Sequence, residues 1–459
     1  MTLDPSIFKA YDIRGIVDEN LTEEVVRNVG RVLGTWAVEA GRDTFCVGRD
    51  GRLSGERLSA ALVEGIASAG ITVLDIGMAP TPVLYFATHH FGNGTGVAVT
   101  GSHNPPEYNG LKMLLAGLTL YGDKIQALRE AVEAGAWNEA YEPGEVRRVD
   151  VIDAYLEKIT STVKLQRPLK IAIDAGNGVA GPTAERLFKG LGCEVTPLFT
   201  DIDGTFPNHH PDPSKLPNLV DLQAAVKAGG LDVGLAFDGD GDRLGVVTPN
   251  GRVIFPDRQM MVFSKAVLEA HPGAPIVYDV KCSRSLVAWI RDHGGVPTIS
   301  RTGHSLVKRM LRETGAPLAG EMSGHIFFND ERWFGFDDGL YAGARLLEIL
   351  SAEENPGAFL ESLPDTCSTP ELNVPMTREQ VVRVIEAMRN TSFEGASDII
   401  TIDGIRVEWP DGFALARPSN TTPVLVLRLE GDTPEALERV RRVFLTALKA
   451  ADPSIELPL

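Results

Sequence analysis

The stretch FCVGRD at residues 45–50 decides the fold, because it is an apolar run that ends in a carboxylate. Such a run is typical of a buried strand that ends at a polar turn. A helical stretch follows it, then Gly70, and then a second apolar run, ITVL, at residues 71–74. The order strand, helix, glycine, strand predicts a βαβ unit whose two strands run parallel.

The same unit recurs twice further along the chain. LKIAID at residues 169–174 leads through a predicted helix at 183–189 to Gly192 and a second strand. PIVYD at residues 275–279 leads through another predicted helix to a pair of glycines and a further strand. Three such units predict three related α/β domains, each with a parallel or mixed sheet.

The last part of the chain has a different pattern. Thr377 is predicted to cap a helix over residues 378–388, and Thr433, followed by Pro434, is predicted to cap a closing helix. Strands between two helices predict a small α+β domain. The apolar residues expected to share one face of the first helix are Val381, Val382, Ile385 and Met388. The predicted strands lie at residues 399–402, 405–408 and 424–427.

The length of 459 residues is enough for about three or four domains of ordinary size. Polar or proline-bearing stretches near Arg148, Gly251 and Pro364 are the predicted boundaries. The predicted fold class is therefore α/β, with three related α/β domains and a C-terminal α+β domain. The predicted domains span residues 1–148, 149–251, 252–364 and 365–459.

The charge of the chain excludes some classes of partner. A formal net charge of −18 with no offsetting basic run argues against nucleic acid or an anionic membrane as partner. The sequence contains no apolar run of the length that a membrane span needs, and its first residues do not resemble a signal peptide. The four cysteines are scattered, which predicts reduced thiols. We therefore expect a cytoplasmic protein, and we expect it to act as a monomer.

The first cluster whose residues could take part in a reaction is TGSHNPP at residues 100–106, which follows a predicted strand at 96–99. A serine on a glycine-flanked turn at a strand end, here Ser102, is expected to be exposed and available for chemistry. His103 is its neighbour, but adjacent side chains diverge in an extended chain, so we do not expect a Ser–His hydrolase dyad.

A second cluster is DGDGDR at residues 238–243, where three carboxylates fall within five residues. The carboxylates repel one another unless a cation lies among them, and the glycines allow the backbone to bend until all three converge. Hard oxygen ligands favour Mg²⁺ or Ca²⁺. An EF-hand is excluded, because Arg243 stands where that loop needs glycine and Pro249 where it needs a bidentate glutamate.

Two further loops combine polar groups that suit a sugar phosphate. GEMSGH at residues 320–325 has a carboxylate that can accept hydrogen bonds from sugar hydroxyls. RPSNTTP at residues 417–423 offers a guanidinium, hydroxyls and backbone N–H groups to a phosphate. Other polar residues near glycines or predicted strand ends are Tyr11, Arg14, Lys112, Lys281 and His304.

These four loops, in this order and with one in each predicted domain, resemble those of the α-D-phosphohexomutase superfamily, and within it the bacterial phosphomannomutase/phosphoglucomutase enzymes. The resemblance covers the whole chain and implies four domains around one deep cleft. It implies that Ser102 is the phosphoserine, that Asp238, Asp240 and Asp242 bind Mg²⁺ together with an oxygen of that phosphoserine, and that Arg243 lies beside the phosphate. It further implies that Glu321 and Ser323 hold the sugar hydroxyls, that Arg417, Ser419, Asn420 and Thr421 bind phosphate, and that Tyr11, Arg14, Lys112, Lys281, His304 and His325 are polar cleft residues.

The activity implied by the resemblance is the reversible conversion of mannose 1-phosphate or glucose 1-phosphate into the 6-phosphate. The phosphoryl group of Ser102 passes to the sugar, a hexose 1,6-bisphosphate is the intermediate, and glucose 1,6-bisphosphate is the expected activator. Arg14, Lys112 and Arg243 are expected to stabilise the charge of the transferred group. Lys112 is our first candidate for acid/base catalysis, with His304 and His325 next.

Three alternatives stay open from the sequence. The first is a phosphoglucosamine mutase, although that group usually carries glutamine at the position of Met322. The second is a metal-dependent sugar phosphatase that hydrolyses the phosphoserine. The third is a non-catalytic relative that binds sugar phosphates or a protein, against which Ser102 and the three aspartates argue.

Overall fold

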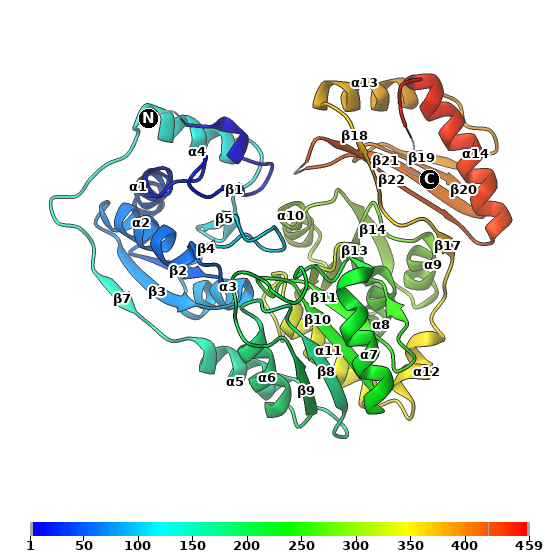
Figure 1. The fold of residues 1–459 in the computed structure, drawn as a ribbon, viewed down its shortest axis with the longest axis horizontal. Coiled ribbons are helices and arrows are strands. Elements are labelled where there is room, and N and C mark those ends of the chain that lie inside the picture. The colour runs from blue at the N-terminus through cyan, green and yellow to red at the C-terminus, as the bar shows by residue number, and fades with distance from the viewer. Residues whose placement is uncertain (1–2, 421, 457–459) are drawn as a thin grey trace.

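The βαβ pattern of the sequence is formed in three separate sheets of the computed structural model, which describes residues 3–420 and 422–456. In each unit the two predicted strands pair in parallel: β2 (Thr44–Arg49) with β3 (Thr72–Met78), β8 (Lys170–Asp174) with β9 (Glu194–Leu198), and β13 (Pro275–Asp279) with β14 (Val296–Ser300). The predicted fold class is therefore confirmed. The four sheets of the chain follow one another in an arc, with the N-terminal and C-terminal sheets at its ends (Figure 1).

The N-terminal sheet has the strand order β1-β5-β4-β2-β3-β7, with β6 paired to β5. Its centre is parallel, because β2 pairs in parallel with both β3 and β4, whereas β5 runs antiparallel to β4 and β1. The strands are β1 (Ile13–Ile16), β2 (Thr44–Arg49), β3 (Thr72–Met78), β4 (Gly96–Val99), β5 (Tyr108–Leu115), β6 (Leu118–Thr119) and β7 (Val146–Arg148). The helices are a 3-10 turn at Pro5–Ile7, α1 (Glu23–Glu39), α2 (Gly55–Ala67), α3 (Thr81–His90) and α4 (Asp123–Ala134).

The second and third sheets repeat this design with fewer strands, in the orders β12-β11-β10-β8-β9 and β14-β13-β15-β16. The second sheet extends past residue 251, because β12 pairs with β11. The elements around the second sheet are α5 (Ile152–Thr162), β8 (Lys170–Asp174), α6 (Gly181–Gly190), β9 (Glu194–Leu198), a 3-10 turn at Leu216–Leu219, α7 (Val220–Gly229), β10 (Val233–Phe237), β11 (Leu244–Val247) and β12 (Val253–Ile254). Those around the third are α8 (Pro256–Ala270), β13 (Pro275–Asp279), α9 (Arg284–Asp292), β14 (Val296–Ser300), α10 (His304–Thr314), β15 (Leu318–Gly320), β16 (Ile326–Phe328), α11 (Gly339–Leu350) and α12 (Pro356–Glu361).

The C-terminal sheet is antiparallel, with the order β17-β22-β21-β20-β19 and β18 paired to β22. Both predicted caps are confirmed, since the side chains of Thr377 and Thr433 accept hydrogen bonds from backbone N–H groups of the helices that follow them. The expectation for Val382 is wrong, because its side chain is exposed and Val384 is buried in its place. The elements are β17 (Cys367–Ser368), β18 (Leu372–Pro375), α13 (Arg378–Arg389), β19 (Asp398–Ile400), β20 (Ile405–Trp409), β21 (Gly412–Pro418), β22 (Val424–Gly431) and α14 (Pro434–Ala451).

The apolar cores divide the chain differently from the sheets. One large core joins the second and third sheets and also takes in α3 and residues of β2, β3 and β4 of the N-terminal domain, with α11 packed against β10 and β11 of the second sheet as well as β16 of the third. The C-terminal sheet has a core of its own, and its apolar contact with the third domain is a small cluster of Val280, Phe413 and Leu415. The middle of the molecule is therefore one packed body, on which the C-terminal sheet rests through a small apolar contact and polar groups.

The four cysteines form no disulfide, and Cys46, Cys193 and Cys282 are buried, whereas Cys367 is partly exposed. None of the helices in the described part of the chain combines the length and apolar character that a membrane span requires.

Candidate functional site

The serine loop follows β4 and brings Ser102 against the acidic loop of the second domain. The Ser102 hydroxyl donates to Oδ2 of Asp238 at 3.1 Å and lies 3.1 Å from Nδ1 of His103. Two expectations are wrong here: the hydroxyl is buried rather than exposed, and the side chains of Ser102 and His103 do not diverge. The reason is the left-handed backbone of Ser102, with φ at 50°, which turns the loop out of the extended conformation.

The acidic loop joins β10 to β11, and its three aspartates converge as the sequence predicts. Their side chains are fully buried, and one oxygen of each lies within 4.8 Å of the others. Gly241 has φ at 78°, which favours glycine. Gly239 is needed for close approach, because a Cβ there would lie 2.3 Å from the carbonyl oxygen of Ser102. The two loops therefore touch through backbone as well as side chains.

Lys112 on β5 reaches this loop from the first domain. Its ammonium group donates to Oδ2 of Asp240 at 2.7 Å and to Oδ2 of Asp242 at 2.5 Å. Burial lowers the pKa of Lys112, but these carboxylates outweigh burial and raise it well above its usual value. Burial and the neighbouring carboxylates of Asp242 and Asp240 raise the pKa of Asp238 well above its usual range. Burial also acts to raise the pKa of Asp240, but Lys112 more than offsets it and the pKa is lowered.

The aspartates fit a small divalent cation. Oδ1 of Asp240 and Oδ1 of Asp242 are buried without a hydrogen-bond partner among the described residues. Buried carboxylate oxygens without a donor are costly unless a cation is bound to them. The donor set consists of oxygen alone, which Mg²⁺ prefers. The residues present are therefore suited to hold Mg²⁺ next to the Ser102 hydroxyl.

Two arginines lie near the serine loop and the acidic loop. Arg14 on β1 donates to the side chain of Asn104 at 2.7 Å and forms an ion pair with Asp12 at 2.6 Å. Arg243 donates through Nε to Nε2 of His325 at 3.1 Å, and the same Nε lies 3.7 Å from Asp238. Burial lowers the pKa of Arg243, but the carboxylate of Asp238 and other nearby acids raise it overall. The guanidinium of Arg14 therefore contacts the serine loop at Asn104, and that of Arg243 lies near Asp238, the partner of the serine hydroxyl.

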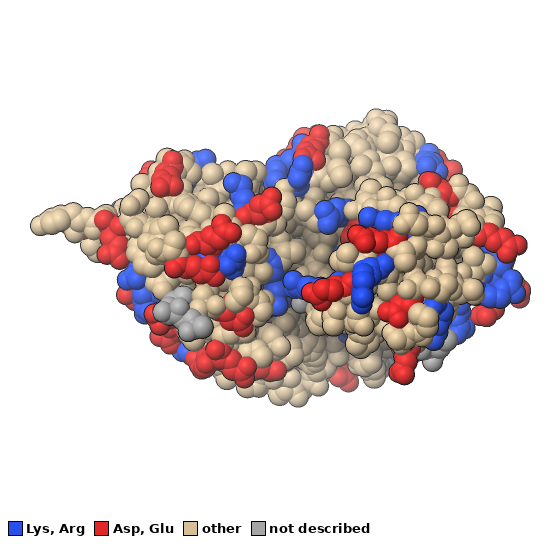
Figure 2. All heavy atoms as spheres, turned by 90° about the horizontal axis from the view of Figure 1, so that it is seen from above, with Lys and Arg blue, Asp and Glu red and all other residues tan. Residues whose placement is uncertain are grey.

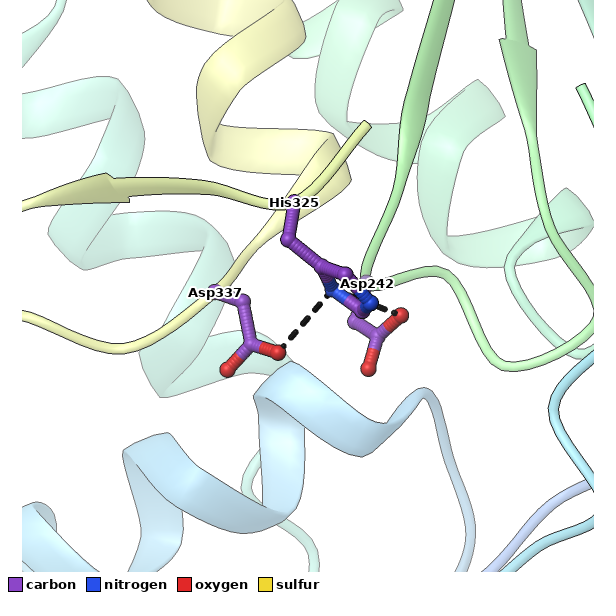
Figure 3. A group of neighbouring side chains, drawn as sticks. All are labelled: Asp242, His325 and Asp337. Carbon is purple, nitrogen blue, oxygen red and sulfur yellow. Dashed lines mark ion pairs between the residues drawn. The ribbon is translucent and has the colours of Figure 1, made fainter. Parts of the chain in front are cut away.

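His325 lies between the acidic loop and Asp337, a carboxylate that the sequence did not point to. Its Nδ1 lies 3.4 Å from Oδ1 of Asp242 and 3.1 Å from Oδ2 of Asp337 (Figure 3). Asp337 is fully buried and also pairs with Lys308 at 2.7 Å. His304, at the start of α10, has its Nδ1 3.7 Å from the same carboxylate. Burial and the charge of Lys308 lower the pKa of His304 well below its usual value, so its ring is neutral near pH 7.

The GEMSGH loop lies between β15 and β16. Glu321 is buried, and its carboxylate accepts a hydrogen bond from the N–H of Gly303. Burial raises the pKa of Glu321. The hydroxyl of Ser323 is buried without a partner among the described residues. Tyr11 comes from the N-terminal domain to the same place, since a Cβ on Gly303 would lie 3.2 Å from its ring.

The RPSNTTP loop, which joins β21 to β22, forms a second centre at one end of the C-terminal sheet. Arg417 is the penultimate residue of β21 and is buried, and Asn420 donates to the carbonyl oxygen of Thr302 at 2.9 Å. The hydroxyl of Ser419 lies 2.9 Å from that of Thr422. Thr421, which the sequence analysis also assigned to phosphate binding, lies outside the described residues. On the side of the third domain, Lys281 pairs with Glu371 at 3.0 Å.

The serine loop rests on a charged pair that the sequence analysis did not assign to the site, Asp50 and Arg52. The guanidinium of Arg52 is fully buried and donates to four carbonyl oxygens, those of Ser102, Asn104, Pro105 and Tyr108. Asp50 accepts from Arg52, from the hydroxyl of Thr100 and from the N–H of Gly101. The strand-end carboxylate was visible in FCVGRD, but the carbonyl groups that Arg52 binds come from a loop 50 residues away.

Replacing Arg52 with methionine is expected to lower the thermal midpoint of the N-terminal domain by roughly 10 °C, because the buried carboxylate of Asp50 loses its cationic partner and four carbonyl groups lose the guanidinium as donor. Differential scanning calorimetry measures this. Arg57→Met is the matched control, since Arg57 is partly exposed and pairs with the exposed Asp18 and Glu23, so its loss is expected to cost about 1 °C to 3 °C. Equal shifts in the two variants would contradict the role of Arg52.

Seen from above, the molecule has a depression between its N-terminal and C-terminal parts, and side chains of both charges lie around it (Figure 2). In a chain with net charge −18, the Lys and Arg side chains among them favour a small anionic ligand there.

Comparison with protein families gives four matches that cover most of the chain in order. They are the models of phosphoglucomutase/phosphomannomutase alpha/beta/alpha domain I at residues 5–139, domain II at 153–251, domain III at 255–367 and the C-terminal domain at 371–447.

Individual relatives are similar over their full length. The chain is 54% identical to a phosphoglucomutase of Neisseria meningitidis, covering 99% of this chain and 98% of the relative. It is 51% identical to a phosphomannomutase/phosphoglucomutase of Pseudomonas aeruginosa, covering 100% and 98%. A solved structure of a phosphoglucomutase/phosphomannomutase family protein from Burkholderia thailandensis superposes with a TM-score of 0.95 at 54% identity and covers both chains completely.

Proposed function

The chain belongs to the phosphoglucomutase/phosphomannomutase family, and we propose that it is a phosphohexomutase that interconverts the 1-phosphates and 6-phosphates of glucose and mannose through a phosphoserine at Ser102. The observation that carries this proposal is the contact of the Ser102 hydroxyl with Asp238 at 3.1 Å, beside two further buried aspartates. A serine phosphate carries about −1.5 to −2 charges near pH 7, so it needs a cation at this place.

The residues around Ser102 support a division of roles. Asp238, Asp240 and Asp242 would hold Mg²⁺, which when bound offsets the phosphate charge and polarises its oxygens. Arg14 and Arg243 are close enough to the serine loop to stabilise the transferred group. Lys112 donates to two carboxylates and so has a proton to give, which suits charge stabilisation and proton donation. His304 and His325 are the remaining candidates for accepting a proton.

In the proposed reaction a sugar hydroxyl oxygen attacks the phosphorus of phosphoserine, and the bond from phosphorus to the serine oxygen breaks. The sugar hydroxyl gives its proton to a basic residue, and the serine oxygen regains one. The product is a hexose 1,6-bisphosphate, which reorients in the site so that its other phosphate faces Ser102 and returns to it. Glucose 1,6-bisphosphate would therefore restore a serine that has lost its phosphate.

The buried position of Ser102 fits this chemistry, because water would otherwise hydrolyse a phosphoserine. The separate core of the C-terminal sheet supports movement of that sheet to admit the sugar phosphate. We further propose the domain division 1–148, 149–251, 252–364 and 365–459, and a monomeric protein in the cytoplasm, as the sequence predicts.

A coupled assay tests the proposed function. Purified protein, with Mg²⁺ and glucose 1,6-bisphosphate, is expected to convert glucose 1-phosphate and mannose 1-phosphate into their 6-phosphates in both directions. Glucosamine 1-phosphate is the third substrate, and release of free phosphate is measured in parallel. Faster conversion of glucosamine phosphate, or phosphate release without isomerisation, would reject the proposal.

For the phosphate-binding loop, we expect Arg417→Ala to raise KM for glucose 1-phosphate by about 10-fold to 100-fold, since a charged hydrogen bond to phosphate is lost. Steady-state kinetics measures this. Arg439→Ala removes a surface arginine of the same domain, which pairs with Asp411, and is expected to leave KM unchanged. An unchanged KM in Arg417→Ala would remove Arg417 from the binding site.

A further inference from the structure

One carboxylate connects the phosphate-binding arginine to the neighbouring domain. Asp403 lies in the turn between β19 and β20 and is buried. Its Oδ2 accepts a hydrogen bond from Nε of Arg417 at 2.9 Å and another from the backbone N–H of Thr302 at 3.0 Å. A single oxygen therefore joins the C-terminal sheet to the loop between β14 and α10 of the third domain.

The contact with Asp403 orients the guanidinium of Arg417. Arg417 is 3% exposed, and its Nη2 is buried without a hydrogen-bond partner among the described residues. An arginine has a long flexible stem, and holding it in its bound conformation before the ligand arrives lowers the entropy cost of binding. With Nε engaged by Asp403, Nη2 is left to bind an anion.

The C-terminal domain binds both backbone polar groups of Thr302. Asp403 binds its N–H, and Asn420 binds its carbonyl oxygen. The same loop contacts the third domain, since the Thr302 hydroxyl donates to Asp279 and the next N–H, that of Gly303, donates to Glu321. The residues proposed for phosphate and for sugar hydroxyls are thus linked through one peptide segment.

We propose that Asp403 is a positioning residue, which holds the Arg417 guanidinium in place for the distal phosphate monoester of the substrate. Because Asp403 also binds Thr302, the position of Arg417 depends on the contact between the C-terminal domain and the third domain. This inference rests on the proposed function, because it takes Arg417 as a phosphate ligand. It assigns to Asp403 an effect on substrate affinity that a carboxylate serving only to neutralise a buried arginine would not have.

Steady-state kinetics of Asp403→Ala and Asp403→Asn tests the proposal. Asp403→Ala is expected to raise KM for glucose 1-phosphate by about 10-fold with kcat changed less than about threefold, because binding and not chemistry is affected. Asp403→Asn keeps an oxygen acceptor and is expected to recover a large part of the loss. Asp411→Ala, which also removes a carboxylate paired with an arginine of this domain, is the matched control and is expected to leave KM unchanged. An unchanged KM in Asp403→Ala would overturn the proposal.

A double-mutant cycle separates positioning from a structural role. If Asp403 acts through Arg417, adding Asp403→Ala to Arg417→Ala is expected to change KM by less than about twofold. Independent, multiplying effects would overturn the proposal. If Asp403→Ala does not fold, as thermal unfolding reports, the same cycle with Asp403→Asn carries the test.

Calorimetric titration with inorganic phosphate keeps this test distinct from that of the proposed function. Asp403→Ala is expected to bind inorganic phosphate several-fold more weakly than the unchanged protein, whether or not the protein isomerises sugars. Absence of mutase turnover in the unchanged protein would reject the proposed function alone. Equal phosphate affinity of the two proteins would overturn the role of Asp403.

Discussion

Replacing Ser102 with alanine is expected to reduce mutase turnover by roughly 10⁴-fold or more, since the variant has no oxygen to carry the phosphoryl group. The variant is expected to fold, because the hydroxyl fills little space and its main hydrogen bond goes to a carboxylate, that of Asp238, which is also bound by two backbone N–H groups. The coupled assay with glucose 1-phosphate measures turnover. Intact-mass spectrometry after incubation with glucose 1,6-bisphosphate reports about one added phosphate on the unchanged protein and none on Ser102→Ala.

Ser161→Ala is the control for this experiment. Ser161 is an exposed serine of α5, so its loss is expected to change neither the added mass nor the turnover. Turnover within tenfold of normal in Ser102→Ala, or a phosphate that still appears on the variant, would mean that another residue carries the phosphoryl group.

Removal of the divalent cation is the second large effect expected. Treatment with a chelator is expected to lower turnover at least about 100-fold, and added Mg²⁺ is expected to restore it, because the buried aspartates and a serine phosphate otherwise repel one another. Asp240→Asn keeps the shape of the side chain and removes one charge, so a similar loss is expected that excess Mg²⁺ only partly recovers. Kinetics across a titration of Mg²⁺ measures both effects.

Asp153→Asn is the matched control for the metal experiment, because Asp153 is an exposed carboxylate that pairs with Arg186 on the surface. Its Mg²⁺ dependence is expected to equal that of the unchanged protein. Full turnover of the chelated protein, or an unchanged Mg²⁺ requirement in Asp240→Asn, would exclude the aspartate loop as the cation site.

The three βαβ units could be predicted from the sequence because each depends on local patterns: apolar strands, a helix and a glycine stop. The two helix caps are local in the same way, since Thr377 and Thr433 bind N–H groups three residues away. The face of α13 was partly wrong because consecutive residues on a helix diverge, so Val381 and Val382 cannot both face the core, whereas Val384 returns to it. Strand β21 was not predicted at all.

The candidate site was predictable where its residues lie within one short loop, as in DGDGDR. It was not predictable where a residue works through a distant partner. Arg52 binds carbonyl groups about 50 residues away, and Asp403 binds Thr302 in another domain. A carbonyl or N–H group has no sequence signature, so these contacts appear only in the fold. The contact of Ser102 with His103 was missed for a different reason, the left-handed backbone at the serine.

Helix α11 belongs by sequence to the third domain and by packing to the second as well. Gly343 in this helix illustrates the fit, because a Cβ there would lie 3.1 Å from the ring of Phe188 on α6. A fragment cut near residue 251 would therefore expose apolar surface on both pieces. The two middle units share a core that α3 of the first domain also enters, so a recombinant fragment should keep the first three domains together, whereas the C-terminal domain has an apolar core of its own and is the natural one to excise.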